Sequence, residues 1–466
     1  MKRNPTYWFA LFLLAHSVAM SQDGDSRISP GKLQALIDKA SVGESLVISP
    51  GIYTGNILIS KRIKLRGMAG AVIRGDGVRS CITITADSCV IEGFTVENSG
   101  KMLVDEDAGI LIKSSHNTIQ HNELRDVLFG IYLYHADSNT IAHNHIVGMQ
   151  ELELGERGSG IHVWNSQYNT LLGNTISQAR DGFYIQNANH TLVIGNEVSN
   201  LRYGLHYMYA DSNQFVGNRF HDNVAGAAIM YSTGIVMRRN EFINNRGFAS
   251  YGILFQDCHG MIADSNTIVD NVTGLFFEAS TDNLFRHNII ARNDVALEMF
   301  QNSVGNTFTE NNFIDNLSPL TIVGKRTESL WNHKGIGNYW SNYDGYDLDG
   351  DGVGDIPMKI QNIFNYLEGT YPNVRLYLYS PASQALAFAA KAFPIVSINQ
   401  EADAFPLMRP VPLRLGAVKQ DNIAGTSSIT SAPKSGNGWV GLSVVAICLG
   451  GLFITRFSKR GVQWSR

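Results

Sequence analysis

One pattern of hydrophobic and polar residues repeats through the middle of the chain, starting at Gly109. Each repeat opens with a glycine and a strand in which apolar and polar residues alternate, then turns, forms a second strand and ends with an asparagine; residues 130–144 are an example. The leading glycines are mostly 22 residues apart and stand at positions 109, 130, 160, 182, 204, 226, 252 and 274. The closing asparagines stand at positions 122, 144, 174, 196, 218, 240, 266, 288 and 311.

This period predicts a solenoid. It is too short for a four-stranded propeller blade and shows no helical periodicity, but it fits one turn in which three short strands are joined by tight corners. Apolar residues such as Ile131, Leu133, Ile141 and Ile146 alternate with polar ones, so every turn adds a layer to one continuous core. We therefore expect an all-β fold, a right-handed parallel β-helix with turns about 4.8 Å apart.

The glycine and asparagine columns suggest how the corners are built. Tight corners need left-handed or bulged backbone, which glycine adopts freely and asparagine tolerates. We therefore expect positive φ angles in these columns. Asparagine side chains stacked on successive turns can also hydrogen-bond to one another along the solenoid.

The regions on either side of the repeats differ from them. Residues 30–40 predict a short amphipathic helix that leads into a strand ending at Tyr53, and residues 28–54 would cap the open N-terminal end of the solenoid. Repeats then run through residues 55–345. Two of them carry insertions, at residues 150–157 and in the 26-residue step from Gly226 to Gly252. Insertions in a solenoid emerge on one face as loops, often the face that binds a partner.

Both ends of the chain carry apolar segments. Residues 1–21 have a basic start, a short apolar run and a small-residue exit, as in a secretory signal peptide; the alternative is a membrane anchor. Residues 438–455 lack charge and are followed by basic residues, which predicts a transmembrane helix with a cytoplasmic tail at 456–466; the alternative is a buried helix. Residues 414–437 read as a linker, and residues 346–413 as an Asp-rich loop with a docking segment that includes an apolar helix over 382–391. The mature chain would then be an exported body tethered to a membrane at its C-terminus.

Composition narrows the function. Of the 466 residues, 44% are hydrophobic and only 17% are charged, with 37 basic and 41 acidic side chains. The net charge of −4 argues against a nucleic-acid partner, which normally meets a basic face. The hydrophobic content is high enough for a core and excludes a disordered acidic chain.

Residues two and four places after each leading glycine should point outward, because side chains alternate along a strand. They form an expected binding face of aromatic residues: Tyr132, Tyr134, His162, Trp164 and Tyr184. Farther along, the same positions hold His206, Met208 and Met230. Imidazole and thioether together suit Cu(I), whereas carboxylates suit Mg²⁺ or Ca²⁺. These three residues are therefore candidate copper ligands, and the alternative is a stripe that packs beneath the inserted loops or at a protein interface.

The acidic residues bear on two further possibilities, enzyme activity and calcium binding. Outward acids at these positions are scarce, Glu278 being the clear one, so the paired carboxylates of a glycosidase or lyase are not evident and we expect no enzyme activity. After the last repeat, Asp347, Asp349, Asp351 and Asp355 resemble the first half of an EF-type calcium loop, with Met358 where the loop's bidentate glutamate would stand. A structural Ca²⁺ is one interpretation and a simple Asp/Gly-rich turn is the other.

Taken together, these motifs resemble the NosD family, periplasmic β-helix proteins that help to assemble the copper site of nitrous oxide reductase. The rungs alone are shared with carbohydrate-active β-helices. The more specific likeness lies in the block from Gly337–Ser341 (GNYWS) to Asp349–Pro357 (DGDGVGDIP). Weaker parts of it are PGIY at Pro50–Tyr53, the tail from Tyr379 to Pro394 and the exit at Phe405–Met408. The resemblance covers about Pro30 to Pro412.

The resemblance implies a non-enzymatic partner of an ABC ATPase and its permease, which receives Cu(I) from a copper chaperone and presents it to nitrous oxide reductase. It also favours the copper interpretation of His206, Met208 and Met230. The C-terminal span departs from the form expected of the family. A second hypothesis remains, a membrane-tethered β-helix that binds or cleaves polysaccharide, with the aromatic face stacking on sugar rings.

Overall fold

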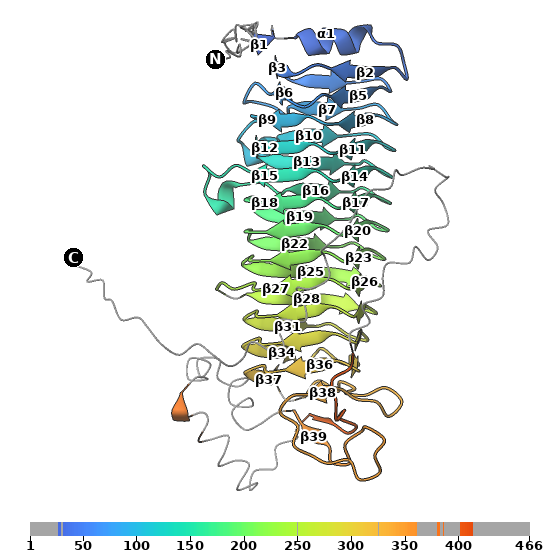
Figure 1. Ribbon diagram of the computed structural model, residues 1–466, viewed down its shortest axis with the longest axis vertical. Coiled ribbons are helices and arrows are strands. Elements are labelled where there is room, and N and C mark those ends of the chain that lie inside the picture. Colours follow the sequence, from blue (N-terminus) through green and yellow to red (C-terminus); the bar gives the residue numbers. More distant parts are fainter. Residues whose placement is uncertain are drawn as a thin grey trace, which may run out of the picture. The chain divides into compact units, whose positions relative to one another are not determined.

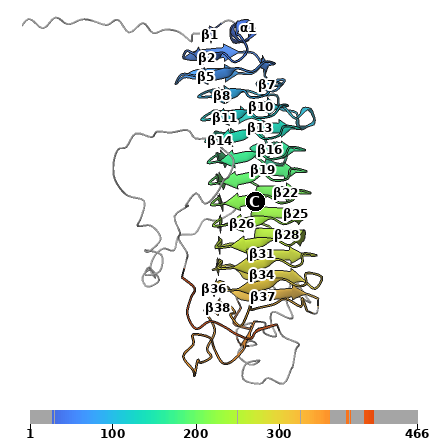
Figure 2. The same cartoon turned by 90° about the vertical axis from the view of Figure 1, so that its right-hand side faces the viewer.

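Three parallel sheets wind around a common core in the computed structural model (Figures 1 and 2), which describes residues 27–28, 31–248, 250–324, 326–360, 380–382, 385 and 401–412. Successive strands along the chain belong to different sheets, and each strand pairs in parallel with the equivalent strand of the next turn. This is the parallel β-helix that the repeat predicts.

Sheet A, as described, has 14 strands: β1 (Arg27–Ile28), β3 (Gly51–Thr54), β6 (Ala71–Arg74), β9 (Thr95–Glu97), β12 (Glu123–Val127), β15 (His145–Gly148), β18 (Thr175–Ser177), β21 (Glu197–Ser199), β24 (Arg219–His221), β27 (Glu241–Ile243), β30 (Thr267–Val269), β33 (Ile289–Ala291), β36 (Asn312–Ile314) and β38 (Tyr339–Trp340). Sheet B has 12 in the described residues: β2 (Ser45–Ile48), β5 (Lys64–Gly67), β8 (Val90–Glu92), β11 (Thr118–Gln120), β14 (Thr140–Ala142), β17 (Thr170–Leu172), β20 (Leu192–Ile194), β23 (Gln214–Val216), β26 (Val236–Arg238), β29 (Ile262–Asp264), β32 (Leu284–Arg286) and β35 (Thr307–Thr309).

Sheet C carries the candidate site and likewise has 12 strands in the described part of the chain: β4 (Ile57–Ile59), β7 (Ile82–Ile84), β10 (Ala108–Ile112), β13 (Phe129–Tyr134), β16 (Ile161–Trp164), β19 (Asp181–Gln186), β22 (Tyr203–Met208), β25 (Ala225–Thr233), β28 (Tyr251–His259), β31 (Thr273–Glu278), β34 (Val295–Phe300) and β37 (Ser318–Val323). β39 (Met358–Lys359) and β40 (Ala402–Asp403) form a separate antiparallel pair.

The core fills the space inside the three sheets. Ile131, Leu133, Ile141 and Ile146 are fully buried, as the alternation predicts. Farther along, the interior is aromatic, and the ring centroids of Phe285 and Phe308 lie 5.1 Å apart on adjacent turns. Because equivalent residues stack turn upon turn, burial of apolar surface continues along the whole stack.

The corners differ from the prediction. Neither the leading glycines nor the closing asparagines have positive φ angles; the residue directly before each closing asparagine has one instead, for example His143 at 54° and Gly217 at 64°. The leading glycines are needed for space. A Cβ at Gly204 would lie 2.6 Å from the carbonyl oxygen of Gly226, the leading glycine of the next turn. The closing asparagines do form the expected ladder, in which Asn196, Asn218 and Asn240 bond in succession.

Helix α1 (Lys32–Lys39) covers the N-terminal end of the stack (Figure 1) and buries Leu33 and Ile37, which confirms the predicted cap helix. At the other end, residues 401–412, here called the closing strap, lie against the last turns. Within the strap, Asp403 is fully buried, and its Oδ2 accepts hydrogen bonds from the Asn338 backbone (2.7 Å) and the Trp340 indole (3.1 Å).

Several predicted segments lie outside the described residues: the signal peptide (1–21), the linker (414–437), the transmembrane helix (438–455), the cytoplasmic tail (456–466) and most of the docking helix (382–391). Within the part of the chain that the structure describes, no helix combines the length and apolar character needed to cross a bilayer.

Candidate metal centre

The outer face of sheet C aligns the predicted site residues in two rows. Tyr132, His162, Tyr184 and His206 lie opposite one another on successive strands β13, β16, β19 and β22. The second row runs through Tyr134, Trp164, Gln186, Met208 and Met230. The predicted residues therefore share one face, and the candidate copper ligands lie at its junction with β25.

His206, Met208 and Met230 occupy neighbouring positions on sheet C. His206 and Met208 are two residues apart on β22, so their side chains share a face, and Met208 pairs with Met230 on β25. On β25, the residue opposite His206 is Ala228. Its side chain is only a methyl group, so His206 has no large neighbour on the β25 side. The Tyr184 hydroxyl lies 3.9 Å from the Met208 sulfur and 2.7 Å from Gln186 Oε1. All three candidate ligands are partly exposed.

Two charged residues that the sequence reasoning missed contact this group. Asp181, the first residue of β19, is fully buried and accepts hydrogen bonds from Arg202 Nε (2.9 Å) and Nη2 (2.7 Å). Its Oδ2 also lies 3.2 Å from His206 Nδ1. The signal was its position: Asp181 directly precedes the leading Gly182, where other repeats have Phe129, Ser159 or Ala225.

The environment keeps Asp181 ionised. Burial raises its pKa, but hydrogen bonds from His206 and Arg202 and the charge of Arg202 outweigh burial and hold the pKa below its ordinary value. His162 is in the opposite situation. Loss of water around it, reinforced by the charge of Arg180, lowers the pKa of its imidazole to about 3, so it is neutral at physiological pH.

The first part of the predicted binding face is covered. Tyr132 is 1% exposed and belongs to a buried cluster against which Leu103 and Leu152 pack. Leu103 begins the short 3₁₀ helix η1 (Leu103–Asp105), and Leu152 lies just before the second one, η2 (Leu154–Glu156). His162 is 9% exposed, and its ring centroid lies 4.4 Å from those of both Tyr132 and Tyr184. Tyr134, Trp164 and Tyr184 remain partly exposed. The insertion at residues 150–157 thus contributes to covering aromatic residues that the sequence places outward.

The Asp-rich loop brings three of its four predicted carboxylates together. Ligand atoms of Asp347, Asp349 and Asp351 lie within 4.8 Å of one another. Asp355 instead accepts a hydrogen bond from the Leu348 backbone at 2.7 Å. Backbone hydrogen bonds, the one from Gly352 foremost, hold the pKa of Asp347 below its ordinary value.

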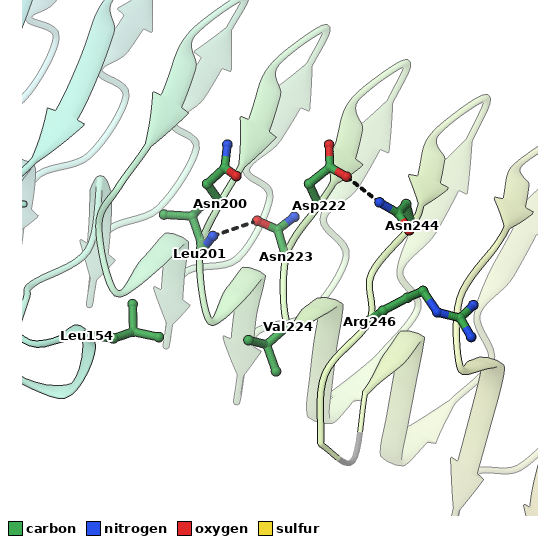
Figure 3. Close-up of a pocket in the computed structure, with 8 residues that line it drawn as sticks. All are labelled: Leu154, Asn200, Leu201, Asp222, Asn223, Val224, Asn244 and Arg246. Carbon is green, nitrogen blue, oxygen red and sulfur yellow. Dashed lines mark hydrogen bonds between the residues drawn. The ribbon is translucent and has the colours of Figure 1, made fainter. Parts of the chain in front are cut away.

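A pocket of about 360 Å³ lies at the corner between sheets A and C (Figure 3). Leu154 of the first insertion and Arg246, just after β27, lie at its two ends, with Leu201 and Val224 between them. Arg246 is held by Asp294, with Nη2 2.8 Å from Oδ2. The pocket includes none of the predicted site residues.

Comparison of the sequence with known proteins identifies the family of the chain. A family profile described as "Periplasmic copper-binding protein (NosD)" matches residues 146–345, and one described as "Right handed beta helix region" matches residues 72–176. The chain is 40% identical to a "Probable ABC transporter binding protein NosD" from Pseudomonas aeruginosa, over 78% of this chain and 87% of the relative. The chain belongs to the NosD family.

A second NosD relative, from Stutzerimonas stutzeri and with the same description, is 34% identical over 89% of this chain and 98% of the relative. Among solved structures, the Dettilon tailspike protein (gp208) covers 60% of this chain with a TM-score of 0.50 and 15% identity, which reflects the β-helix fold alone. Both NosD relatives are named as binding proteins and not as enzymes.

The block that most resembles NosD has a structural role at the end of the stack. Asn338 extends the asparagine ladder by accepting a hydrogen bond from Asn311 Nδ2 at 2.9 Å, and Trp340 is buried against Phe313 with ring centroids 4.1 Å apart. Both residues hydrogen-bond to Asp403 of the closing strap. In this member of the family, Asn338 and Trp340 of the motif therefore connect the last turns to the closing strap.

Proposed function

We propose that this protein is a copper-handling accessory protein that works with an ABC transporter in maturation of nitrous oxide reductase. The observation that carries the proposal is the group of His206, Met208 and Met230 on adjacent strands of a NosD-family β-helix. Imidazole and thioether groups together select Cu(I). Copper is the cargo in this proposal, and the protein holds it without transforming it.

The names of the relatives, ABC transporter binding proteins, support a transporter as partner, and the other proposed partners rest on the copper role. An ABC permease and ATPase would hold the protein at the inner membrane, a copper chaperone would supply Cu(I), and nitrous oxide reductase would receive it. We propose a periplasmic location after removal of residues 1–21, with residues 438–455 as a membrane anchor. Burial of Tyr132 and His162 disfavours the alternative of sugar stacking along the aromatic face.

The copper site is tested by titrating Cu(I) into the full chain without oxygen, in competition with a Cu(I) chelator. We expect His206→Ala combined with Met208→Ala to abolish the tight site. A matched control, His145→Ala with Met102→Ala, removes the same residue types from exposed positions elsewhere and should leave the titration unchanged. An unchanged stoichiometry in the first double variant would contradict the residue assignment.

The role is tested in two further ways. Affinity purification of the tagged full chain from solubilised membranes should recover an ABC permease and ATPase. Nitrous oxide reductase isolated from cells that lack this protein should contain less copper. The proposal would be contradicted if neither transporter subunit is recovered and the reductase from cells that lack this protein is fully loaded with copper.

We also propose a structural Ca²⁺ bound by Asp347, Asp349 and Asp351, with Asp355 closing the loop. Calorimetry with CaCl₂ tests it: an Asp347→Asn, Asp349→Asn variant should lose a Ca²⁺-dependent rise in Tm. If Ca²⁺ does not change the Tm of the unmodified chain, the cluster is only a turn.

A further inference from the structure

The two ring nitrogens of His206 have different surroundings. This matters for metal binding, because an imidazole that binds a metal through one nitrogen usually donates a hydrogen bond from the other. The Nδ1 atom of His206 faces Asp181 Oδ2 at 3.2 Å and Arg202 Nη2 at 3.5 Å. Within the described residues, Nε2 has no hydrogen-bond partner. Among the described residues, the His206 ring is therefore hydrogen-bonded only through Nδ1, while the rings of Tyr184 and Tyr203 pack against it with centroids at 4.8 and 5.2 Å.

The contacts of Asp181 decide which nitrogen carries the proton. Arg202 Nη2 already donates to Asp181 Oδ2 at 2.7 Å, a much closer contact than its 3.5 Å approach to the imidazole. A carboxylate can only accept, so the hydrogen bond between His206 and Asp181 requires a proton on Nδ1. The neutral ring then carries its lone pair on Nε2.

We propose that Asp181, fixed by Arg202, is a positioning residue that holds His206 in the Nδ1–H tautomer and so makes Nε2 the copper-binding atom. This proposal rests on the proposed function. Burial supports it: Asp181 is 0% exposed at its side chain and His206 is 15% exposed, so the contact is shielded from water on the Asp181 side. Arg180, whose Nε lies 3.5 Å from Asp181 Oδ2, is a second cation beside the same carboxylate.

The chain contains a matched control on another sheet. Asp264 accepts hydrogen bonds from Arg286 Nε (3.1 Å) and Nη2 (2.9 Å) and faces His287 Nδ1 at 3.0 Å. The histidine and arginine are exposed to a similar extent, with His287 at 12% and Arg286 at 39% against 38% for Arg202, whereas Asp264 is 16% exposed and Asp181 is fully buried. His287 Nε2 faces Glu310 at 3.3 Å, where His206 has the methionines on its face. This triad has the same local chemistry without the soft ligands.

The first experiment needs no metal. The full chain is labelled with ¹⁵N in histidine, and the tautomer of His206 is read from the imidazole nitrogen signals that disappear in His206→Gln. We expect Nδ1–H in the unmodified protein. Asp181 Oδ2 accepts from Arg202 Nη2 and faces His206 Nδ1. In Asp181→Asn the charge is lost and an NH₂ group replaces one of the two oxygens. Where that group faces His206 Nδ1 it donates to this atom, so the Nε2–H form should gain population. Asp264→Asn should leave the His206 signals unchanged.

The second experiment measures Cu(I) affinity of the same variants by chelator competition. We expect Asp181→Asn to weaken binding about 10- to 100-fold, the usual effect of removing such a hydrogen-bond partner, and Asp264→Asn to have no effect. Arg202→Gln, a change at a partly exposed side chain, should give a smaller loss of the same kind. This variant retains the test if Asp181→Asn does not fold.

The two experiments separate the two proposals. An Nε2–H tautomer in the unmodified protein, or a tautomer that Asp181→Asn and Arg202→Gln leave unchanged, overturns the positioning role. A tautomer that shifts as expected supports that role even when His206→Gln binds Cu(I) as tightly as the unmodified protein, and in that case it is the copper site of the proposed function that fails.

Discussion

Asparagine side chains in the closing column bond to two neighbouring turns at once. Asn218 donates from Nδ2 to Asn240 Oδ1 (2.9 Å) and to the Val193 carbonyl (2.8 Å), while its own Oδ1 accepts from the backbone and side chain of Asn196. Its side chain is fully buried. The closing asparagines, which the sequence pattern suggests are turn residues, thus hydrogen-bond to backbone groups inside the stack. An unpaired polar group there costs about 1–3 kcal/mol.

Replacing Asn218 with alanine should therefore lower the free energy of unfolding by about 3 kcal/mol, because several buried donors and acceptors lose their partner together. Urea denaturation measures the change. Gln214→Ala, an exposed position of the same turn, is the control and should change stability by less than about 0.5 kcal/mol. Equal losses in the two variants would contradict the ladder as a source of stability.

His162 predicts a pH dependence. Its folded-state pKa of about 3 lies below the ordinary value of 6.5, so between these values the unfolded chain binds a proton that the folded chain does not. Stability from this residue is fully present above pH 6.5 and falls as the pH drops toward 3. Between pH 6.5 and pH 5 the loss should be about 2 kcal/mol, at about 1.4 kcal/mol per pH unit.

The measurement compares urea unfolding of the unmodified protein and His162→Gln at both pH values, so that other titrating groups cancel. We expect the unmodified protein to lose more stability than the variant on acidification. Parallel changes in the two proteins would show that His162 is accessible to protons in the folded state.

At the scale of the element, the hydrophobic pattern predicts the strands well, because alternation of buried and exposed residues is a local property of a strand. It does not predict the role of the leading glycines. Positive φ angles occur at other corner positions, among them the residues before the closing asparagines, and the leading glycines are required where neighbouring strands of sheet C approach closely. Such an approach is a contact between turns, and no single repeat contains it.

Gly204→Ala should consequently destabilise the protein by about 2 kcal/mol or more, because its Cβ would lie 2.6 Å from the Gly226 carbonyl oxygen. Gly217→Asn is the matched control: φ is 64° there, which asparagine tolerates, and no atom lies within 4 Å of the added Cβ. Thermal unfolding of both variants checks this. A larger drop in Tm for Gly217→Asn would contradict the roles assigned to these two glycines, close strand packing at Gly204 and a positive φ angle at Gly217.

At the scale of the whole molecule, both ends of the solenoid need covering, since an open end exposes core residues and unpaired strand edges. α1 covers the N-terminal end, as its amphipathic sequence predicts. At the C-terminal end the closing strap reaches back to residues more than 60 positions earlier in the chain, such as Asn338. The resemblance to NosD identified this segment, but only the structure shows what it contacts.

Asp403→Ala should loosen the strap, because the backbone of Asn338 and the indole of Trp340 lose their acceptor. Hydrogen exchange should become faster at Leu407 and Met408, whose amides bond to the carbonyls of Asn338 and Gly352. Exchange near β22 should be unchanged and serves as an internal control. Unaltered exchange at Leu407 would mean that Asp403 does not hold the strap.

The C-terminal apolar segment gives a prediction for localisation. Removing residues 438–466 should reduce the amount of protein that stays with membranes after a carbonate wash, because a span of about 18 apolar residues is lost. Val444→Asp with Ala446→Asp should have the same effect, whereas Val444→Ala should not. If the truncated chain remains fully membrane-bound, its partners and not this segment hold it there.

The sequence by itself determined the parallel β-helix, its strands, the asparagine ladder and the shared face of His206, Met208 and Met230, because all of these follow from a local period and from alternation along strands. Only the tertiary structure decided which residues on that face are covered and which charged side chains contact the candidate ligands. Tyr132 lies in a buried cluster against which Leu103 and Leu152 of other turns pack, and His162 is covered by the rings of Tyr132 and Tyr184 on the neighbouring strands. Asp181 meets His206 across 25 residues of chain. Contacts between turns set these features, and the period of the repeat carries no information about them.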